Sequence, residues 1–173
     1  MRKILLVIDM QNDFIDGSLG STEAMSIVQN VINKIKEYSP ENVFATKDTH
    51  EVNYLSTSEG RHLPVEHCIR GSEGWDIRPE IRSLIPPENV YEKGTFGSLA
   101  LAEKVAEMAR KVEISVEMVG LCTDICVVSN ALLIKAYLPE IPISVDSSCC
   151  AGVTPEKHAA ALETMRSCQI NVE

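Results

Sequence analysis

Two cysteines stand close together in residues 120–128, GLCTDICVV, and one of them is placed to act as a nucleophile. If Thr123 caps a helix that begins there, Cys126 falls in its first turn, among free backbone N–H groups and the positive end of the helix dipole. Both effects lower the pKa of a thiol toward the reactive thiolate. Cys122 precedes that helix, and the C-x3-C spacing of the pair gives little support to a redox motif or a zinc ribbon.

An acid and a base follow two other predicted strands, at the edge where parallel sheets gather their binding residues. Asp9 follows an apolar run near the start of the chain, and Lys93 follows a short strand in the middle. Asp9 is placed to accept the thiol proton and return it to a leaving amine, with Lys93 as a positive charge beside the sulfur. Each residue also has an ordinary interpretation, because such an Asp is often a turn residue, such a Lys is often solvated and such a Cys is often packed.

Apolar runs and helical patterns alternate along the whole chain, and these elements position the three residues. The predicted strands cover 3–8, 42–46, 89–92, 114–119, 141–145 and, at an edge, 169–172, and the predicted helices cover 22–38, 98–112, 123–137 and a segment that opens at 154. This alternation predicts an α/β fold with a mostly parallel sheet of five to six strands and helices on both faces. No linker or repeat interrupts it, so residues 1–173 are predicted to form a single domain.

Composition restricts the classes of partner and compartment. The formal net charge is -9 and no cluster of Lys or Arg offsets it, so nucleic acid is not an expected partner. No apolar run reaches the ~20 residues that a membrane span needs, so no membrane partner is expected either. Six cysteines without an export signal predict free thiols in a reducing, cytoplasmic compartment.

A long polar stretch over residues 48–74 carries a candidate metal set. Asp48 and His50 are two residues apart and can reach one ion from an extended segment, and His67 completes a set of two histidines and one carboxylate. Such a set with open positions is common in catalytic and substrate-binding metal sites. Taken alone, an Asp and two His in a polar loop are more often solvated side chains, so these residues by themselves leave the question open.

Three segments, VIDMQNDF, EKGTFGS and GLCTDICVV, together resemble the signature segments of the isochorismatase-like cysteine hydrolases. That superfamily includes nicotinamidases, N-carbamoylsarcosine amidases and isochorismatases, and the resemblance runs nearly end to end. It implies a Rossmann-like three-layer fold in which Asp9, Lys93 and Cys126 are catalytic. It also implies a cis peptide between Leu121 and Cys122, and an oxyanion hole formed by the backbone N–H groups of Cys122 and Cys126.

Within that superfamily, the candidate metal set resembles the set found in nicotinamidases. These enzymes have D-x-H and, later, a His in a P-x-H-C segment. The resemblance implies that Asp48, His50 and His67 bind a divalent metal, zinc first, with iron or manganese as alternatives, and that the metal receives the pyridine nitrogen of nicotinamide. The chain departs from the usual pattern at Thr49, where an aromatic residue is common, and by one additional residue between Pro64 and His67.

The activity implied by the resemblance is hydrolysis of nicotinamide to nicotinate and ammonia by a cysteine-dependent amidase, through a thioester. Phe14, Trp75 and Phe96 are candidate apolar walls of the substrate pocket, and ordinary core packing explains them equally well. The first alternative is a related hydrolase of a carbamoyl or ureido compound, and the second is a thiol-redox or binding protein with a Cys122–Cys126 disulfide. Relatives are often dimers or tetramers, so the resemblance also implies a homodimer or homotetramer.

Overall fold

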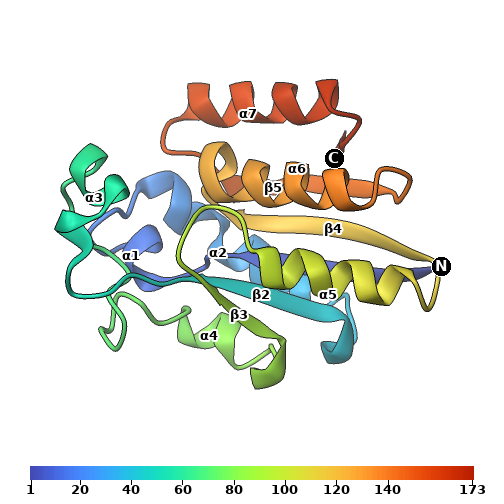
Figure 1. Ribbon diagram of the computed structural model, residues 1–173, viewed down its shortest axis with the longest axis horizontal. Coiled ribbons are helices and arrows are strands. Elements are labelled where there is room, and N and C mark those ends of the chain that lie inside the picture. Colours follow the sequence, from blue (N-terminus) through green and yellow to red (C-terminus); the bar gives the residue numbers. More distant parts are fainter.

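The computed structural model describes residues 1–173, and a six-stranded sheet in the order β3-β2-β1-β4-β5-β6 forms its centre (Figure 1). The strands are β1 (Arg2–Ile8), β2 (Val43–Asp48), β3 (Val90–Lys93), β4 (Ile114–Leu121), β5 (Ile143–Ala151) and β6 (Asn171–Val172). Every pairing between neighbouring strands is parallel. The expected α/β fold, with a mostly parallel sheet of five to six strands, is therefore confirmed.

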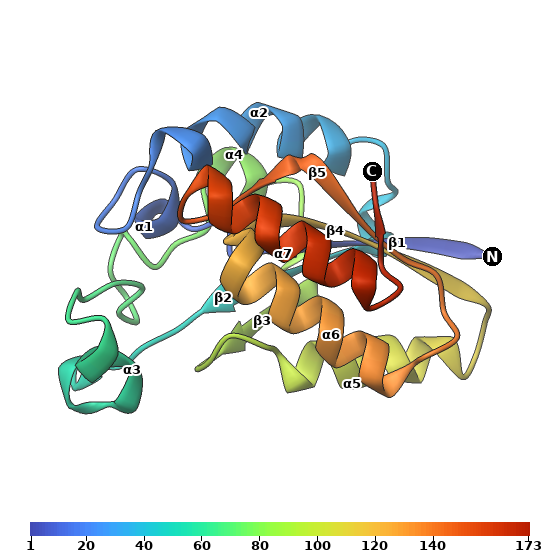
Figure 2. The same ribbon diagram turned by 90° about the horizontal axis from the view of Figure 1, so that it is seen from above.

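Helices cover both faces of the sheet, as expected (Figure 2). One face packs against α1 (Asn12–Ile15), α2 (Thr22–Ile35) and α4 (Pro79–Arg82), and the other against α5 (Leu99–Ala109), α6 (Val128–Tyr137) and α7 (Pro155–Ser167). Short 3-10 turns cover Pro40–Asn42, Tyr54–Ser56 and Pro87–Asn89. The short helix α3 (Ser58–His62) stands apart from both layers, in the connection between β2 and β3 (Figure 1). None of the helices combines the length and the apolar character that a membrane span requires.

The apolar run of β1 explains how one strand serves two cores. Successive side chains of a strand point to opposite faces of its sheet. Ile4, Leu6 and Ile8 accordingly join the cluster under α5, α6 and α7, while Leu5 and Val7 join the cluster under α1, α2 and α4. Because both faces are covered, the strand is apolar without alternation, and its carboxyl end is held at the centre of the sheet.

Two predicted elements differ from the structure where the chain approaches the site. The expected helix over 123–137 begins instead with a wide π-helical turn, Thr123–Val127, before α6. β5 runs six residues farther than predicted, to Ala151, because the pairing of β4 with β5 resumes after a register shift and joins Gly120 to Cys150. Asp146, Ser147 and Ser148 therefore lie within this strand.

Gly120 allows β1 and β4 to approach closely next to the site. It pairs with Ile8, the last residue of β1, and has a φ of 120°, which residues with a side chain rarely adopt. A Cβ atom at this position would lie 2.1 Å from the Ile8 carbonyl oxygen. The ends of the two central strands therefore meet only when position 120 is glycine.

Candidate active site and metal centre

The acid, the lysine and the thiol selected from the sequence meet in one buried group. Lys93 Nζ lies 2.7 Å from Asp9 Oδ2 and 3.5 Å from Cys126 Sγ. Lys93 is 6% exposed, Asp9 0% and Cys126 5%. The ends of β1 and β3 and the turn after β4 thus bring the three residues together, with the lysine contacting both of the others.

Asp9 is fixed by a pair of hydrogen bonds with Thr46 on β2. The Thr46 hydroxyl donates to Asp9 Oδ1 at 2.6 Å, and the Asp9 N–H donates back to the same hydroxyl oxygen at 3.2 Å. Asp9 also has a φ of 45°, in the left-handed region that few residues other than glycine adopt. Residues held in this region are concentrated at functional sites, where surrounding contacts keep them in place.

Cys126 lies in the wide turn that follows a cis peptide between Leu121 and Cys122, at the bond where the resemblance places one. The residue that caps this turn is Cys122 rather than Thr123. The Thr123 hydroxyl instead pairs with His158 Nδ1 on α7 at 2.8 Å. The expectation that Thr123 caps a regular helix is therefore wrong, because α7 occupies its hydroxyl.

Asn130 on α6 ties the nucleophile turn to the segment after Lys93. Its Nδ2 donates to the carbonyl of Cys126 at 2.8 Å and to the carbonyl of Phe96 at 3.1 Å, and its Oδ1 accepts from the Ser98 N–H at 2.9 Å. This amide is buried, so its hydrogen bonds do not compete with water. One side chain thus holds the thiol and the lysine-bearing segment at a fixed separation.

Burial dominates the protonation of the thiol. It raises the pKa of Cys126 well above its usual value, and the charge of Asp9 raises it further while Lys93 opposes the increase. The expected lowering of this pKa is therefore wrong, because lost hydration of the thiolate outweighs the N–H groups of the turn. Burial raises the pKa of Asp9 as well. Burial alone would lower the pKa of Lys93, but the charges of Asp9 and Asp48, and that of Cys126 when it is ionised, outweigh it and raise that pKa. The resting site thus holds a charged lysine and a neutral thiol.

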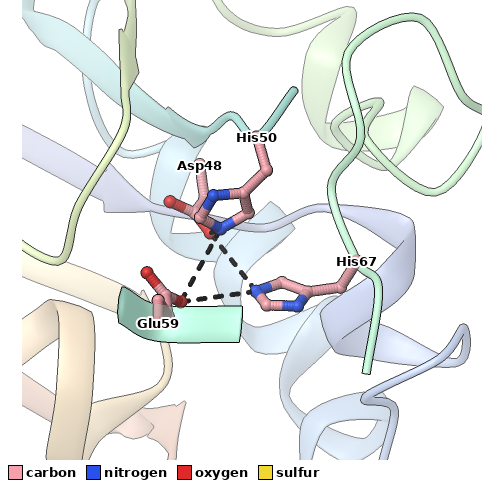
Figure 3. Close-up of side chains that lie close together, drawn as sticks. All are labelled: Asp48, His50, Glu59 and His67. Atoms are coloured by element: carbon pink, nitrogen blue, oxygen red, sulfur yellow. Dashed lines mark hydrogen bonds and ion pairs between the residues drawn. The ribbon is translucent and has the colours of Figure 1, made fainter. Parts of the chain in front are cut away.

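Four side chains that could hold a metal ion converge next to this group, including the three expected from the sequence (Figure 3). One donor atom from each of Asp48, His50, Glu59 and His67 lies within 4.8 Å of the others. His50 Nε2 is 3.0 Å from Asp48 Oδ2 and 3.7 Å from Glu59 Oε1, and His67 Nε2 is 3.7 Å from both oxygens. A tetrahedral ion with bonds of about 2.1 Å separates its ligands by roughly 3.4 Å, so the four donors fit a divalent ion such as zinc.

The metal-site imidazoles are held by neighbours that suit ligation. His67 Nδ1 donates to the Val65 carbonyl at 2.9 Å, so its Nε2 keeps the lone pair that faces the cluster. The buried ring of Tyr54 lies 4.7 Å from the His50 ring and 5.0 Å from the His67 ring, and Phe14 lies 5.5 Å from His67. These aromatic contacts fix the ring planes and keep water from the far side of the cluster.

Asp48 connects this candidate metal cluster to the group formed by Asp9, Lys93 and Cys126. Its Oδ2 faces the two histidines, while its Oδ1 lies 3.2 Å from Lys93 Nζ. Burial alone would raise the pKa of Asp48, but the neighbouring imidazoles of His50 and His67 and the charge of Lys93 outweigh it and hold that pKa well below its usual range. Asp48 is therefore ionised at neutral pH and provides a charged ligand.

Sequence reasoning missed Glu59, the fourth member of the cluster. Glu51, Glu66 and Glu73 lie in the same polar stretch, and spacing alone does not distinguish the four glutamates. The available signal was Thr57, whose side chain accepts a hydrogen bond from the Gly60 N–H and so begins the short helix that carries Glu59. Thr57 as a helix cap would have placed Glu59, and not the other glutamates, in an ordered first turn.

The three aromatic residues proposed as pocket walls lie in different surroundings. Phe14 is buried against the metal-site rings, and Phe96 is 43% exposed. Trp75 donates its indole N–H to Thr49 Oγ1 at 2.8 Å, and Lys47 Nζ lies 3.1 Å from the centre of its ring. The role of these aromatic residues as substrate walls stays a prediction.

The backbone at Cys122 provides a free donor beside the nucleophile turn. The Cys122 carbonyl accepts from the N–H groups of Ile125 and Val127, each at 3.1 Å, which fixes the turn. The Cys122 N–H itself makes no hydrogen bond within the protein. An unoccupied N–H at this point suits an oxyanion donor. The assignment of the oxyanion hole to the N–H groups of Cys122 and Cys126 stays a prediction.

Comparison with known proteins places the whole chain among isochorismatase-like sequences. The family model described as "Isochorismatase domain" matches residues 3–173. A Bacillus subtilis protein named "Uncharacterized isochorismatase family protein PncA" is 30% identical over 173 residues, covering 94% of this chain and 93% of that protein. The "Nicotinamidase/pyrazinamidase" of Mycobacterium tuberculosis is 28% identical over 184 residues, covering 98% of this chain and 97% of that protein.

Solved structures resemble the chain over its full length. The crystal structure of nicotinamidase/pyrazinamidase PncA from Bacillus subtilis has a TM-score of 0.81 and 26% identity, and covers 99% of each chain. The structure of a pyrazinamidase from Pyrococcus horikoshii in complex with zinc has a TM-score of 0.79 and 24% identity, covering 100% of this chain and 99% of that one. The likeness to the second structure concerns the fold.

Proposed function

Since this chain belongs to the isochorismatase family, as its signature segments predict, we propose that it is a metal-containing, cysteine-dependent amidase that hydrolyses nicotinamide to nicotinate and ammonia. The observation that carries the proposal is the position of Lys93, whose Nζ contacts Asp9, Cys126 and Asp48 at once. A nucleophile, its proton acceptor and a metal-binding carboxylate thus share one buried cation. We assign residues 1–173 to one hydrolase domain.

The first half of the reaction forms a thioester. Asp9 takes the proton of Cys126 Sγ as the sulfur attacks the amide carbonyl carbon, and the S–C bond forms. The N–H groups of Cys122 and Cys126 hold the negative charge that develops on the carbonyl oxygen. The C–N bond then breaks, and Asp9 returns its proton to the leaving ammonia.

The second half releases the acid and restores the enzyme. Asp9 accepts a proton from water as the water oxygen attacks the thioester carbon. The S–C bond then breaks, Asp9 passes its proton to the departing Cys126 Sγ, and the acid product leaves and ionises in solution. Lys93 remains protonated throughout, because the charges of Asp9 and Cys126 raise its pKa. Its role is to stabilise the thiolate and the ionised Asp9 in a site where neither is hydrated.

The proposed metal ion is held by Asp48, His50, His67 and Glu59, and zinc is the first candidate. When bound, the ion would supply a Lewis-acid position for the ring nitrogen of the substrate, which would orient the amide toward Cys126. Zinc usually takes four ligands, so either Glu59 would have to leave the ion or the site would have to accept a fifth ligand for the substrate to bind. Iron or manganese, with six positions, would accept the substrate without releasing a ligand.

The proposal includes a cytoplasmic location and a homodimer or homotetramer. Six free cysteines support a reducing compartment. On α6, partly buried Leu132 and Leu133 supply apolar surface that a second copy of the chain can cover.

Trapping the thioester tests the proposed chemistry. Wild-type enzyme loaded with zinc is mixed with nicotinamide, quenched in acid and digested, and the peptide that contains Cys126 is weighed by mass spectrometry. We expect a nicotinoyl group on Cys126 in the wild type and in no other cysteine peptide, and none in Cys126→Ser. A modified cysteine elsewhere would contradict the assignment of the nucleophile. An acyl group from a carbamoyl or ureido compound, with none from nicotinamide, would favour the alternative substrate class.

A further inference from the structure

A buried amide outside both the Asp9–Lys93–Cys126 group and the metal set contacts the backbone of Asp48. Gln11 is 0% exposed, and its Oε1 accepts from the Asp48 N–H at 2.7 Å. Its Nε2 donates to the carbonyl oxygens of Asp48 and Trp75, each at 2.8 Å. The side chain thus pairs with both backbone groups of Asp48, as a neighbouring strand would. A primary amide offers a separate acceptor oxygen and an NH2 donor side by side without charge, and Asn is one methylene shorter than Gln.

Asp13 makes a similar contact with the backbone directly after His67. Its Oδ2 accepts from the Cys68 N–H at 2.7 Å, and its Oδ1 from the Ser18 N–H at 3.3 Å. Cys68 directly follows His67 and has a φ of 48°, so the chain turns sharply just after that ligand. Gly74 packs against the Asp13 carboxylate so closely that a Cβ atom would lie 2.2 Å from it. The carboxylate is therefore confined, and it confines the turn after His67.

We propose that Gln11 and Asp13 are positioning residues for the metal centre. The segment that supplies Asp9 then also holds the backbone beside two metal ligands, Asp48 and His67, in place. This inference rests on the metal site of the proposed function. Gln11 fixes the backbone of Asp48 at the end of β2, and Asp13 fixes the backbone beside His67. Neither contacts a reacting atom. Loss of a partner that orients a metal ligand typically weakens metal affinity by about 10- to 100-fold.

The test compares metal binding by three variants of the full chain. Gln11→Met keeps the length of the side chain and removes its three hydrogen bonds, and Asp13→Asn keeps the shape of the carboxylate and removes one acceptor. Asn12→Ala is the matched control, because Asn12 lies between them and donates instead to the Glu73 carbonyl at 2.9 Å. Co²⁺ is the probe, since its visible absorption reports both occupancy and ligand geometry, and competition with a chelator gives its dissociation constant.

We expect Gln11→Met to bind Co²⁺ at least about tenfold more weakly than wild type, with altered visible bands, and Asp13→Asn to bind it more weakly as well. Asn12→Ala should keep the wild-type affinity and spectrum. A folded Gln11→Met with wild-type affinity and spectrum would overturn the inference. If that variant does not fold, an unchanged dissociation constant in Asp13→Asn overturns it. If the wild type binds no Co²⁺, both the proposed metal centre and this inference are wrong. If the wild type and the variants bind Co²⁺ equally well, only this inference is wrong.

Discussion

Removing the charge of Lys93 tests how the buried thiol is activated. Lys93 Nζ lies 3.5 Å from Cys126 Sγ. Two unit charges at this separation attract by about 5 kcal/mol at an effective dielectric constant of about 20. The charge of Asp9 acts on the thiol in the opposite direction and offsets part of this attraction. We therefore expect Lys93→Met to reduce the thiolate population of Cys126 at a fixed pH by about tenfold to a thousandfold.

The assay is alkylation by iodoacetamide over a range of pH, in enzyme from which metal has been removed. Because all six cysteines are free, the extent of reaction is read on the Cys126 peptide by mass spectrometry. In Lys93→Met the pKa of the thiol rises further, so alkylation at neutral pH slows and its midpoint moves to higher pH. Asp9→Asn removes a charge that raises this pKa, so alkylation at neutral pH becomes faster while amide hydrolysis is lost.

The control for Lys93→Met is Lys47→Met on the adjacent strand. Lys47 Nζ lies over the Trp75 ring and pairs with Asp76, so its loss should leave the Cys126 alkylation profile unchanged. Circular dichroism confirms that each variant is folded before it is compared. A folded Lys93→Met with the wild-type pH profile would refute the electrostatic role of Lys93, and slower alkylation in Asp9→Asn would refute the role of Asp9.

Three further substitutions test the metal set and the fold around the site. Glu59→Gln should weaken zinc binding by about tenfold in a chelator competition, since it removes one charged ligand; unchanged affinity would show that Glu59 is not a ligand. Gly120→Ala should lower the free energy of unfolding in urea by at least about 3 kcal/mol, because the added methyl meets the Ile8 carbonyl; a near-wild-type value would contradict the close approach of β1 and β4. Burial alone would raise the pKa of Asp146, but hydrogen bonds from Ser148 and Lys34 outweigh it and lower that pKa. A depressed carboxyl pKa stabilises above about pH 5 and loses this effect as pH falls, so Asp146→Asn should destabilise the protein by about 1 kcal/mol at pH 7 and progressively less below pH 5. A stability difference between wild type and Asp146→Asn that does not change with pH would contradict the lowered pKa of Asp146.

The fold and the catalytic group were predictable because they depend on local pattern and strand order. Apolar runs and helical periodicity located the strands, and parallel strands bring their carboxyl ends to one edge whatever their separation in sequence. Asp9 follows β1, Lys93 ends β3 and Cys126 lies in the turn after β4, so their meeting required no knowledge of side-chain packing.

The thiol environment and the fourth metal-binding side chain were not predictable, because each depends on distant packing. Thr123 would suit a helix cap, but its hydroxyl forms a hydrogen bond with His158 on α7, which is 35 residues away. Burial of Cys126 beneath neighbouring elements then reverses the expected direction of its pKa shift. Glu59 reaches the histidines only because α3 turns it toward them (Figure 3).

Gln11 shows the same dependence on distant contacts. It lies inside the first signature segment, yet its partners Asp48 and Trp75 are 37 and 64 residues away. Nothing in the segment itself indicates which backbone groups the amide serves, so its contribution follows only from the folded arrangement.

Ammonia release from nicotinamide tests the central claim most directly. It is measured for wild type and Cys126→Ala, each with and without a chelator, after both proteins are shown to be folded. We predict release by the wild type, loss of release on chelation and its recovery with zinc, and none from Cys126→Ala under any condition. Release by Cys126→Ala, or no release by folded, zinc-loaded wild type, would contradict the account.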